Sequence, residues 1–287
     1  MNINFGRHRS KTKKNNILDC INNTKKQKET LFGMFLCSGI YFDKTKVSLN
    51  IINNKALLKK NFQSMIGVVH SPYTNSLATL DLNLWNKTKS KLLEELILCT
   101  EIGIKYLVIH PNSNKNKEDR TLTLNKIIDR LNKLLKIYKN LDLKGRKTIL
   151  LLENTAYFKS IGYIKELEYI INKIQHQELI GICLDTCHLF SLELDLNNLN
   201  KTNKFLLTIE SKFIKLLHFN NSQYSYLSNR DKHASFEQGE IKLSSMKNFL
   251  YGMISVKKQN FDILLETPFT TQDKDIKILR KWLNNYE

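Results

Sequence analysis

Residues 148–185 read TILLLENTAYFKSIGYIKELEYIINKIQHQELIGICLD, and the prediction of the fold starts from this segment. It begins and ends with short apolar runs, TILLLE at 148–153 and GICLD at 181–185. Between these runs, apolar residues recur at the spacing of one helical face, namely Ile164, Leu167, Ile170 and Ile171. Strands that are apolar throughout are typical of parallel strands covered by helices on both faces. The stretch therefore predicts a strand–helix–strand unit with parallel strands.

The same alternation extends over the whole chain. Eight apolar runs are present: Asn4–His8, Leu31–Leu36, Ile66–His70, Tyr106–His110, Thr148–Glu153, Gly181–Asp185, Ile214–His218 and Asp262–Glu266. Apolar residues at helical spacing also mark 92–97, 127–135 and 276–283. Eight strands alternating with helices predict an α/β fold, a (β/α)8 TIM barrel in a single domain over residues 1–287. An open doubly wound sheet is the alternative, because periodicity does not show whether a sheet closes.

Composition excludes several classes of protein. The 41% hydrophobic and 25% charged residues are ordinary for a globular chain. No apolar run approaches the ~18 residues of a membrane span. The N-terminus also lacks the apolar core of a secretory signal. We therefore expect a soluble intracellular monomer with no membrane partner; a cytoplasmic, a nuclear and a viral-particle location are all compatible with the sequence.

The five cysteines are odd in number and sparse, which favours a reducing compartment. Cys183 and Cys187 are four residues apart, but no second pair completes a zinc ribbon, so we interpret both as small residues at a strand end. Whether Cys20 and Cys37 pair stays open. No Gly-rich phosphate loop follows any predicted strand, which argues against a nucleotide cofactor.

The chain is strongly basic. Lys and Arg number 45 against 27 acidic residues, a net charge of +18. Residues 1–60 alone hold thirteen Lys and Arg against three acids. A basic surface attracts polyanions, most often nucleic acid. An AT-rich genome, which favours Lys, Asn and Ile codons, would give a similar composition, so charge by itself leaves both explanations open.

Side chains that bind metals stand at the ends of the predicted strands. Six are strand-end residues: His70, His110, Glu153, Asp185, His218 and Glu266. Three more follow closely: His188, Asp231 and His233. In a parallel barrel these ends meet at one face, where the chemistry of such barrels is found. Five of the seven histidines belong to this set, which is more than chance placement would give.

The mixture of neutral imidazole and carboxylate is preferred by zinc and, less selectively, by manganese or iron. Nine ligands exceed the four that one zinc ion binds, so two or three ions with bridging carboxylates are expected. Such clusters activate a bound water and stabilise both oxygens of a phosphoryl displacement. With the basic charge, this indicates a metal-dependent nuclease or phosphatase.

Seven segments resemble one known family in the same order along the chain. They are VVHSPY (68–73), LVIHP (107–111), LLENTA (151–156), CLDTCH (183–188), LLHFN (216–220), DKHAS (231–235) and LLETP (264–268). These segments resemble the endonuclease IV family of apurinic/apyrimidinic (AP) endonucleases. The resemblance implies a zinc-dependent enzyme of base-excision repair that cuts the phosphodiester 5′ to an abasic sugar, leaves a 3′-hydroxyl and trims blocked 3′ ends of double-stranded DNA.

The resemblance also implies the ligand sets of about three Zn²⁺ per chain, with Mn²⁺ as an alternative at one site. His70 and His110 would hold the first ion, with Glu153 bridging to a second. Asp185, His218 and Glu266 would complete the second site, and His188, Asp231 and His233 the third. Glu153 and Glu266 would be the carboxylates closest to the reaction.

The lesion-recognition segments depart from the family pattern. Tyr73 matches a Tyr that the family inserts into the duplex, but Thr74 stands where a Leu is usual. The loop CSGIYFD (37–43) lacks the family's Arg, so Ile40, Tyr41 or Phe42 would be the wedge there. Asn221 replaces an Asp that usually follows Asn220. A basic loop would supply DNA contacts through Lys11, Lys13 and Lys14, although the same run also resembles a nuclear address.

Two other functions are considered for a sequence with these features. Related barrels with His, Glu and Asp at strand ends are sugar isomerases or epimerases that use one or two metal ions. A DNA-binding relative without catalysis is the second alternative. The basic charge and the triad His188, Asp231 and His233 argue against the first, and the complete set of nine ligands argues against the other.

Overall fold

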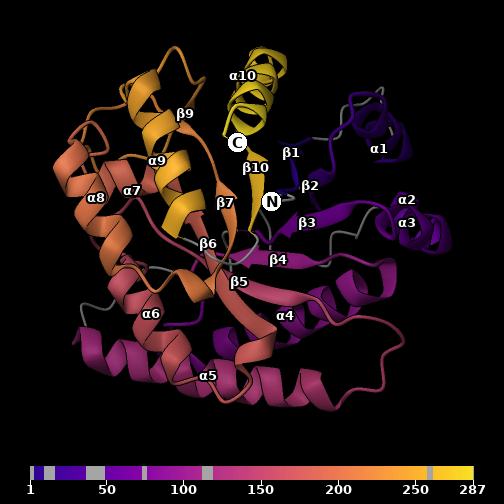
Figure 1. Cartoon of the computed structure of the whole chain (residues 1–287). Coiled ribbons are helices and arrows are strands. Elements are labelled where there is room, and N and C mark those ends of the chain that lie inside the picture. Colours follow the sequence, from indigo (N-terminus) through magenta and orange to yellow (C-terminus); the bar gives the residue numbers. More distant parts are fainter. Residues whose placement is uncertain are drawn as a thin grey trace.

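The structure is a computed structural model that describes residues 3–9, 17–36, 49–72, 76–111, 119–256 and 261–286. Eight parallel strands form a closed barrel in the order β1-β10-β7-β6-β5-β4-β3-β2 (Figure 1). The strands are β1 Phe5–His8, β2 Leu31–Phe35, β3 Ile66–His70, β4 Tyr106–Ile109, β5 Ile149–Glu153, β6 Ile180–Asp185, β7 Ile214–His218 and β10 Asp262–Leu265. Because β1 pairs with both β2 and β10, the predicted TIM barrel is confirmed and the open sheet is wrong.

Helices surround the strands on the outside of the barrel (Figure 1). They are α1 Ile17–Lys26, α2 Leu49–Asn53, α3 Lys55–Phe62, α4 Leu82–Ile102, α5 Arg120–Asn140, α6 Ile164–Asn172, α7 Thr186–Leu192, α8 Leu199–Thr208, α9 Leu243–Val256 and α10 Gln272–Asn284. Two 3-10 turns, Gln177–Leu179 and Ser211–Phe213, lead into β6 and β7. The four helical segments expected from apolar spacing lie within α4, α5, α6 and α10.

The strands are apolar throughout because each one packs on two sides. Successive side chains of a strand point to opposite faces. One set fills the barrel interior: Leu31, Val68, Tyr106, Val108, Leu151, Cys183, Leu216 and Leu264. The other set joins a larger core between the strands and the helices, with Val69, Leu107 and Leu152 among its members. Both cores hold the strand ends, and therefore the predicted ligands, in fixed positions.

A small hairpin was not expected from the sequence. The strands β8 Asn221–Ser222 and β9 His233–Ala234 pair antiparallel, with Ser222 opposite His233. Each strand has only two residues, which is too short for an alternating pattern to be recognised. The hairpin turns the long segment after β7 back toward the barrel axis.

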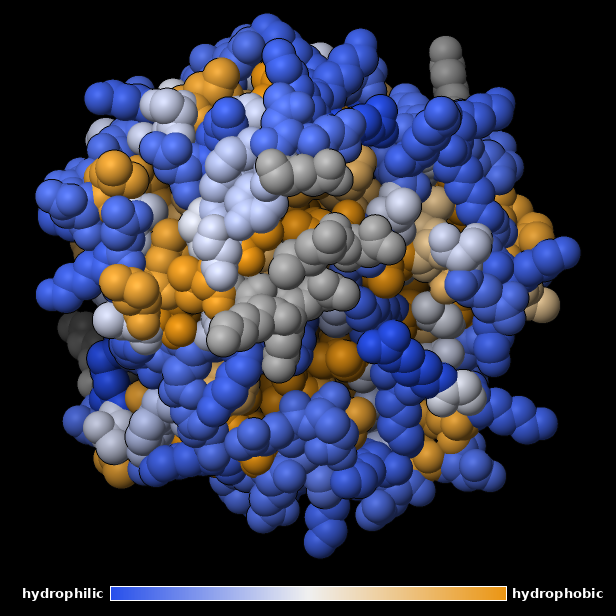
Figure 2. Space-filling model, in the orientation of Figure 1, coloured by the Kyte–Doolittle hydropathy of each residue, from blue (hydrophilic) through white to orange (hydrophobic). Residues whose placement is uncertain are grey.

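The helices in the described ranges include none that combines the length and the apolar composition needed to cross a bilayer. The face of the molecule in Figure 2 is mainly hydrophilic at its periphery, with apolar patches nearer its middle.

Candidate metal centre

All nine predicted ligands lie in the described residues, and the barrel brings them to one end. Six are at the carboxyl-terminal ends of strands, as expected, although His110 and Glu266 are the first residues past β4 and β10. The parallel register keeps neighbouring ends level, and Asp185 pairs with His218 across β6 and β7. His188 comes from α7, whereas Asp231 and His233 come from the hairpin.

Glu153 lies at the centre of the cluster. Its Oε2 is 3.0 Å from Nε2 of His70 and 3.3 Å from Nε2 of His110. Its Oε1 is 2.8 Å from Nδ1 of His218. Each carboxylate oxygen therefore faces a different group of donors, which is the arrangement that a bridging carboxylate needs.

A second group of donors shares Glu153 with the first. Nδ1 of His218 is 3.1 Å from Oε2 of Glu266 and 4.0 Å from Oδ2 of Asp185. Ligand atoms of Glu153, Asp185, His218 and Glu266 all lie within 4.8 Å of one another. Three carboxylates and one imidazole thus converge on a single buried point.

The third group is built by the hairpin and α7. Oδ1 of Asp231 is 3.1 Å from Nε2 of His188 and 3.6 Å from Nε2 of His233. His233 also approaches the second group, because its Nε2 is 3.5 Å from Oδ2 of Asp185. The three groups therefore form one connected cluster.

Backbone carbonyls orient three of the imidazoles. A carbonyl can only accept a hydrogen bond, so the ring nitrogen that faces it carries the proton and the other nitrogen is available to a metal. These Nδ1 donations run from His70 to Ser71 at 2.8 Å, from His188 to Asn154 at 2.9 Å and from His233 to Glu266 at 3.3 Å. Metal-binding histidines in proteins are usually held in this way.

Two asparagines position ligands, and sequence reasoning missed both. Nδ2 of Asn220 donates to Oδ2 of Asp185, and Oδ1 of Asn220 accepts from the Glu266 backbone N–H, each at 2.7 Å. Asn154 clamps the backbone of Asp185 from the other side, accepting at 2.6 Å and donating at 3.0 Å. Each asparagine closely follows a strand end in LLENTA or LLHFN, and this position was the only signal available.

Carboxylates and imidazoles in the cluster shift one another's pKa values. Burial alone would raise the pKa of Glu153, but nearby imidazoles, His218 first, outweigh it and hold that pKa well below its usual value. Burial alone would lower the pKa of His188, but carboxylates, Asp185 first, raise it well above its usual value. Burial lowers the pKa of His110 to about 4. An ionised Glu153 and a neutral His110 are ligand states that suit a divalent cation, and binding of a cation would release the proton that the carboxylates hold on His188.

The residues present fit zinc. Four ligands at Zn–N and Zn–O bond lengths stand about 3.3 Å apart in a tetrahedron. Several nitrogen–oxygen separations in the cluster, from 3.0 to 3.6 Å, match that edge. Nε2 of His233 is also buried and makes no hydrogen bond within the described part of the chain. A metal ion would satisfy this atom.

The predicted DNA contacts lie outside the described residues. These are Lys11, Lys13, Lys14, Ile40, Tyr41 and Tyr73, and the same holds for Phe42, Thr74 and Cys37. Cys183 is buried in β6 as expected. Cys187 lies instead in the first turn of α7, because Asp185 ends β6 and caps that helix.

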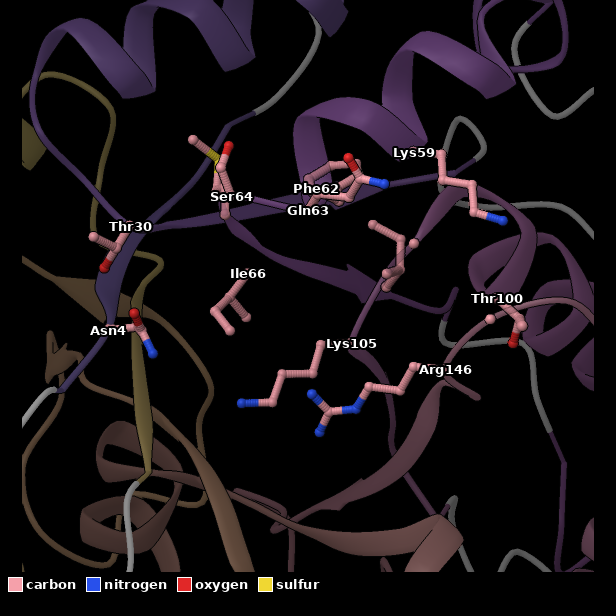
Figure 3. Close-up of a pocket in the computed structure, with 14 residues that line it drawn as sticks. Asn4, Thr30, Lys59, Phe62, Gln63, Ser64, Ile66, Thr100, Lys105 and Arg146 are labelled. Carbon is pink, nitrogen blue, oxygen red and sulfur yellow. The ribbon is translucent and has the colours of Figure 1, made fainter.

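A hollow of about 550 Å³ lies at the opposite end of the barrel (Figure 3). Its lining includes Thr30, Ile66 and Lys105, which stand at or just before the amino-terminal ends of β2, β3 and β4. It contains none of the predicted ligands. The chemistry of the cluster is therefore confined to the other face of the barrel.

Comparison with known proteins places the chain among barrels of this type. Residues 42–286 match the family described as a xylose isomerase-like TIM barrel. A probable endonuclease 4 of Thermosipho melanesiensis is 34% identical over 205 residues, which are 69% of each chain. An apurinic-apyrimidinic endonuclease 1 of Plasmodium berghei is 31% identical over 229 residues, 78% of this chain and 43% of that protein.

The fold is also shared with a solved structure. The crystal structure of endonuclease IV from Thermus thermophilus superposes with a TM-score of 0.77 over 98% of this chain and 99% of that one. The sequences are 22% identical, so this likeness bears on the fold alone.

Proposed function

Because this chain belongs to the endonuclease IV family of apurinic/apyrimidinic endonucleases, we propose that it is a zinc-dependent AP endonuclease of base-excision repair. It hydrolyses the DNA phosphodiester 5′ to an abasic sugar, leaves a 3′-hydroxyl and also trims blocked 3′ ends. The observation that carries the proposal is the convergence of nine donors into three groups linked by Glu153 and Asp185. The basic charge of the chain supports a DNA substrate.

The three donor groups would each hold one zinc ion. His70, His110 and Glu153 form the first, Glu153 with Asp185, His218 and Glu266 the second, and His188, Asp231 and His233 the third. Bound zinc would lower the pKa of a water molecule and stabilise the charge that develops on the phosphate.

The protein's own residues supply position and charge. The backbone carbonyls that bind Nδ1 hold the imidazoles in one orientation, and Asn220 ties the Asp185 carboxylate to the backbone of Glu266. The carboxylates of Glu153 and Glu266 both approach Nδ1 of His218, at 2.8 and 3.1 Å, and there they would supply the negative charge that holds a metal cation. Burial of this set excludes bulk water from the ligands.

Incision of a duplex with a single abasic site, with and without a chelator, tests the proposal. A zinc enzyme nicks this duplex and loses the activity after prolonged chelation. The product carries a 3′-hydroxyl that a polymerase extends. A sugar isomerase or epimerase would leave the duplex intact, and an inactive DNA-binding relative would bind without nicking. Metal analysis of the same sample separates the last two cases.

The metal content gives a direct prediction. Metal-replete protein should contain about three zinc ions per chain, because nine mixed ligands with a shared bridge match three four-coordinate sites. Elemental analysis measures this number. Brief chelation should remove little metal, since most of the ligands are buried. A content of one ion or none per chain would contradict the assignment.

Lesion contacts are proposed for segments outside the described residues. Tyr73, with Ile40 or Tyr41, would enter the duplex at the abasic position. Lys11, Lys13 and Lys14 would contact phosphates, and such contacts release counterions from DNA. The partner proposed for these residues is double-stranded DNA with an abasic site or a blocked 3′ end.

Changing Lys11, Lys13 and Lys14 together to glutamine should make DNA binding less salt-dependent. Removing one lysine–phosphate interaction lowers the log–log salt slope by about 0.9. Binding titrations at several salt concentrations measure the slope. Lys133, Lys136 and Lys139, which are exposed on α5, provide a matched triple substitution that should change it less. Equal slopes for both triple variants would mean that the basic loop faces away from DNA.

A further inference from the structure

Three large aromatic side chains are exposed in the described part of the chain. Tyr157 is 45% exposed, Phe158 47% and Phe269 76%. All three lie on loops that follow β5 and β10, at the end of the barrel that holds the metal ligands. Loops that a rigid barrel positions around a site commonly carry the residues that contact its substrate. The place of these loops next to the candidate metal centre links the three side chains to the substrate.

Phe269 is presented by a rigid turn. It stands three residues after Glu266, at the tip of a turn in which the Thr271 N–H donates to the Pro268 carbonyl at 2.9 Å. The base of the same loop is tied to the metal centre, because Nδ1 of His233 donates to the Glu266 carbonyl. These hydrogen bonds hold the backbone of the loop beside the ligands, while the Phe269 side chain remains largely exposed.

Phe158 is held in a similar way on the other side. The Ser160 N–H donates to the Tyr157 carbonyl at 3.0 Å and closes a turn with Phe158 near its tip. The Phe158 N–H donates to Oδ1 of Asn229 at 2.7 Å, which joins this loop to the segment that carries Asp231.

The loops that carry the two rings stand on either side of the third group in the order of the strands. In the closed sheet, β7 and β6 lie between β10 and β5, and the segments after β6 and β7 carry His188, Asp231 and His233. Phe269 follows β10 and Phe158 follows β5, so the segments that carry these ligands lie between the two loops.

The segment that carries Asp231 also exposes two cations. Arg230 and Lys232 are exposed on either side of Asp231, whose carboxylate points inward to His188. Duplex DNA offers both features that this surface needs, phosphates for the cations and base faces for the rings. At an abasic site one base is missing, so the bases around the gap have faces without a stacking partner.

We propose that Phe269 and Phe158 form a base-stacking site that binds the nucleobases exposed around an abasic sugar. The proposal rests on the AP endonuclease function proposed above and adds the residues that recognise the lesion from the β5 and β10 loops. Stacking on an aromatic ring tolerates any base, which suits an enzyme that must act in every sequence context.

The test compares Phe269→Ala and Phe158→Ala with Leu207→Ala, which removes an 80% exposed apolar side chain from α8. Each Phe variant should raise KM for an abasic duplex about tenfold, with little change in kcat, because loss of one base–aromatic stack weakens binding by this order. Phe269→Trp should retain the wild-type KM, whereas Phe269→Leu should not. Zinc content and melting temperature should match the wild-type protein.

Fluorescence of a base analogue provides a second measurement, which reports base stacking before the phosphodiester bond is cut. With 2-aminopurine opposite the abasic sugar, stopped-flow fluorescence should fall on binding of the wild-type protein and of Phe269→Trp, and fall less with Phe269→Ala. The inference is overturned if both Phe variants behave like Leu207→Ala in KM and in fluorescence, or if they lose zinc. A wild-type protein that does not nick abasic DNA contradicts the proposed function instead, while the fluorescence still decides on stacking.

Discussion

Replacing Glu266 with glutamine should reduce incision of abasic DNA by about two orders of magnitude or more, while the fold remains intact. The reason is the charge at this position. Oε2 of Glu266 is 3.1 Å from Nδ1 of His218, and after burial the imidazoles, His218 first, hold the pKa of Glu266 well below its usual value. The carboxylate is therefore ionised throughout the working pH range. Glutamine keeps the shape of the side chain but removes that charge from the second donor group.

The measurement is kcat on a duplex with one abasic site, together with zinc content and a thermal melt. Glu94→Gln on α4 is the matched control, because Glu94 is exposed and belongs to none of the donor groups, and it should leave all three quantities unchanged. If Glu266→Gln cut abasic DNA at the wild-type rate, Glu266 would not belong to the reacting centre.

Replacing Asn220 with alanine should lower zinc affinity 10- to 100-fold, the usual effect of removing a partner of a metal ligand. Asn220 is fully buried, and its amide makes one bond to the Asp185 carboxylate and one to the backbone of Glu266. Alanine leaves both groups unsatisfied, which should also cost about 1–3 kcal/mol of stability. Competition with a chelator measures zinc affinity, and a chemical denaturation curve measures stability.

Two further variants sharpen this test. Asn220→Asp keeps the acceptor for Glu266 but places a second carboxylate against Asp185, so it should bind zinc no better than Asn220→Ala. Asn203→Ala, on the exposed side of α8, should change neither quantity. Wild-type zinc affinity in Asn220→Ala would assign Asn220 to packing rather than to the metal centre.

The structure also explains one departure from the family pattern. Asn221 stands where an Asp is usual, and its amide Nδ2 donates to the carbonyls of Phe236 at 2.9 Å and Ile241 at 2.8 Å. Its Oδ1 accepts from the N–H groups of Ser222 and Ile241. An ionised carboxylate has no proton to donate to the two carbonyls, so this hairpin requires an amide here.

The fold could be predicted because its signals are local. Strands such as β5 and β6 are apolar on both faces, and helices such as α6 repeat apolar residues at one spacing, so residue type alone reveals both elements. The features that could not be predicted have weak local signals. The β8–β9 hairpin is too short for a pattern, and the single capping residue Asp185 is too weak a signal to show that Cys187 lies in α7 rather than at a strand end.

Eight strands, the donors at their ends and the zinc-like mixture of imidazole and carboxylate could be predicted, because each of these follows from residue type and local order. Which donors share a site depends on how the barrel closes. His70 and Glu153 are 83 residues apart in the chain, yet the closed barrel brings their ligand atoms to 3.0 Å. The roles of Asn220 and Asn154 were decided in the same way, since an amide becomes a positioning group only when the strand register places it against a ligand.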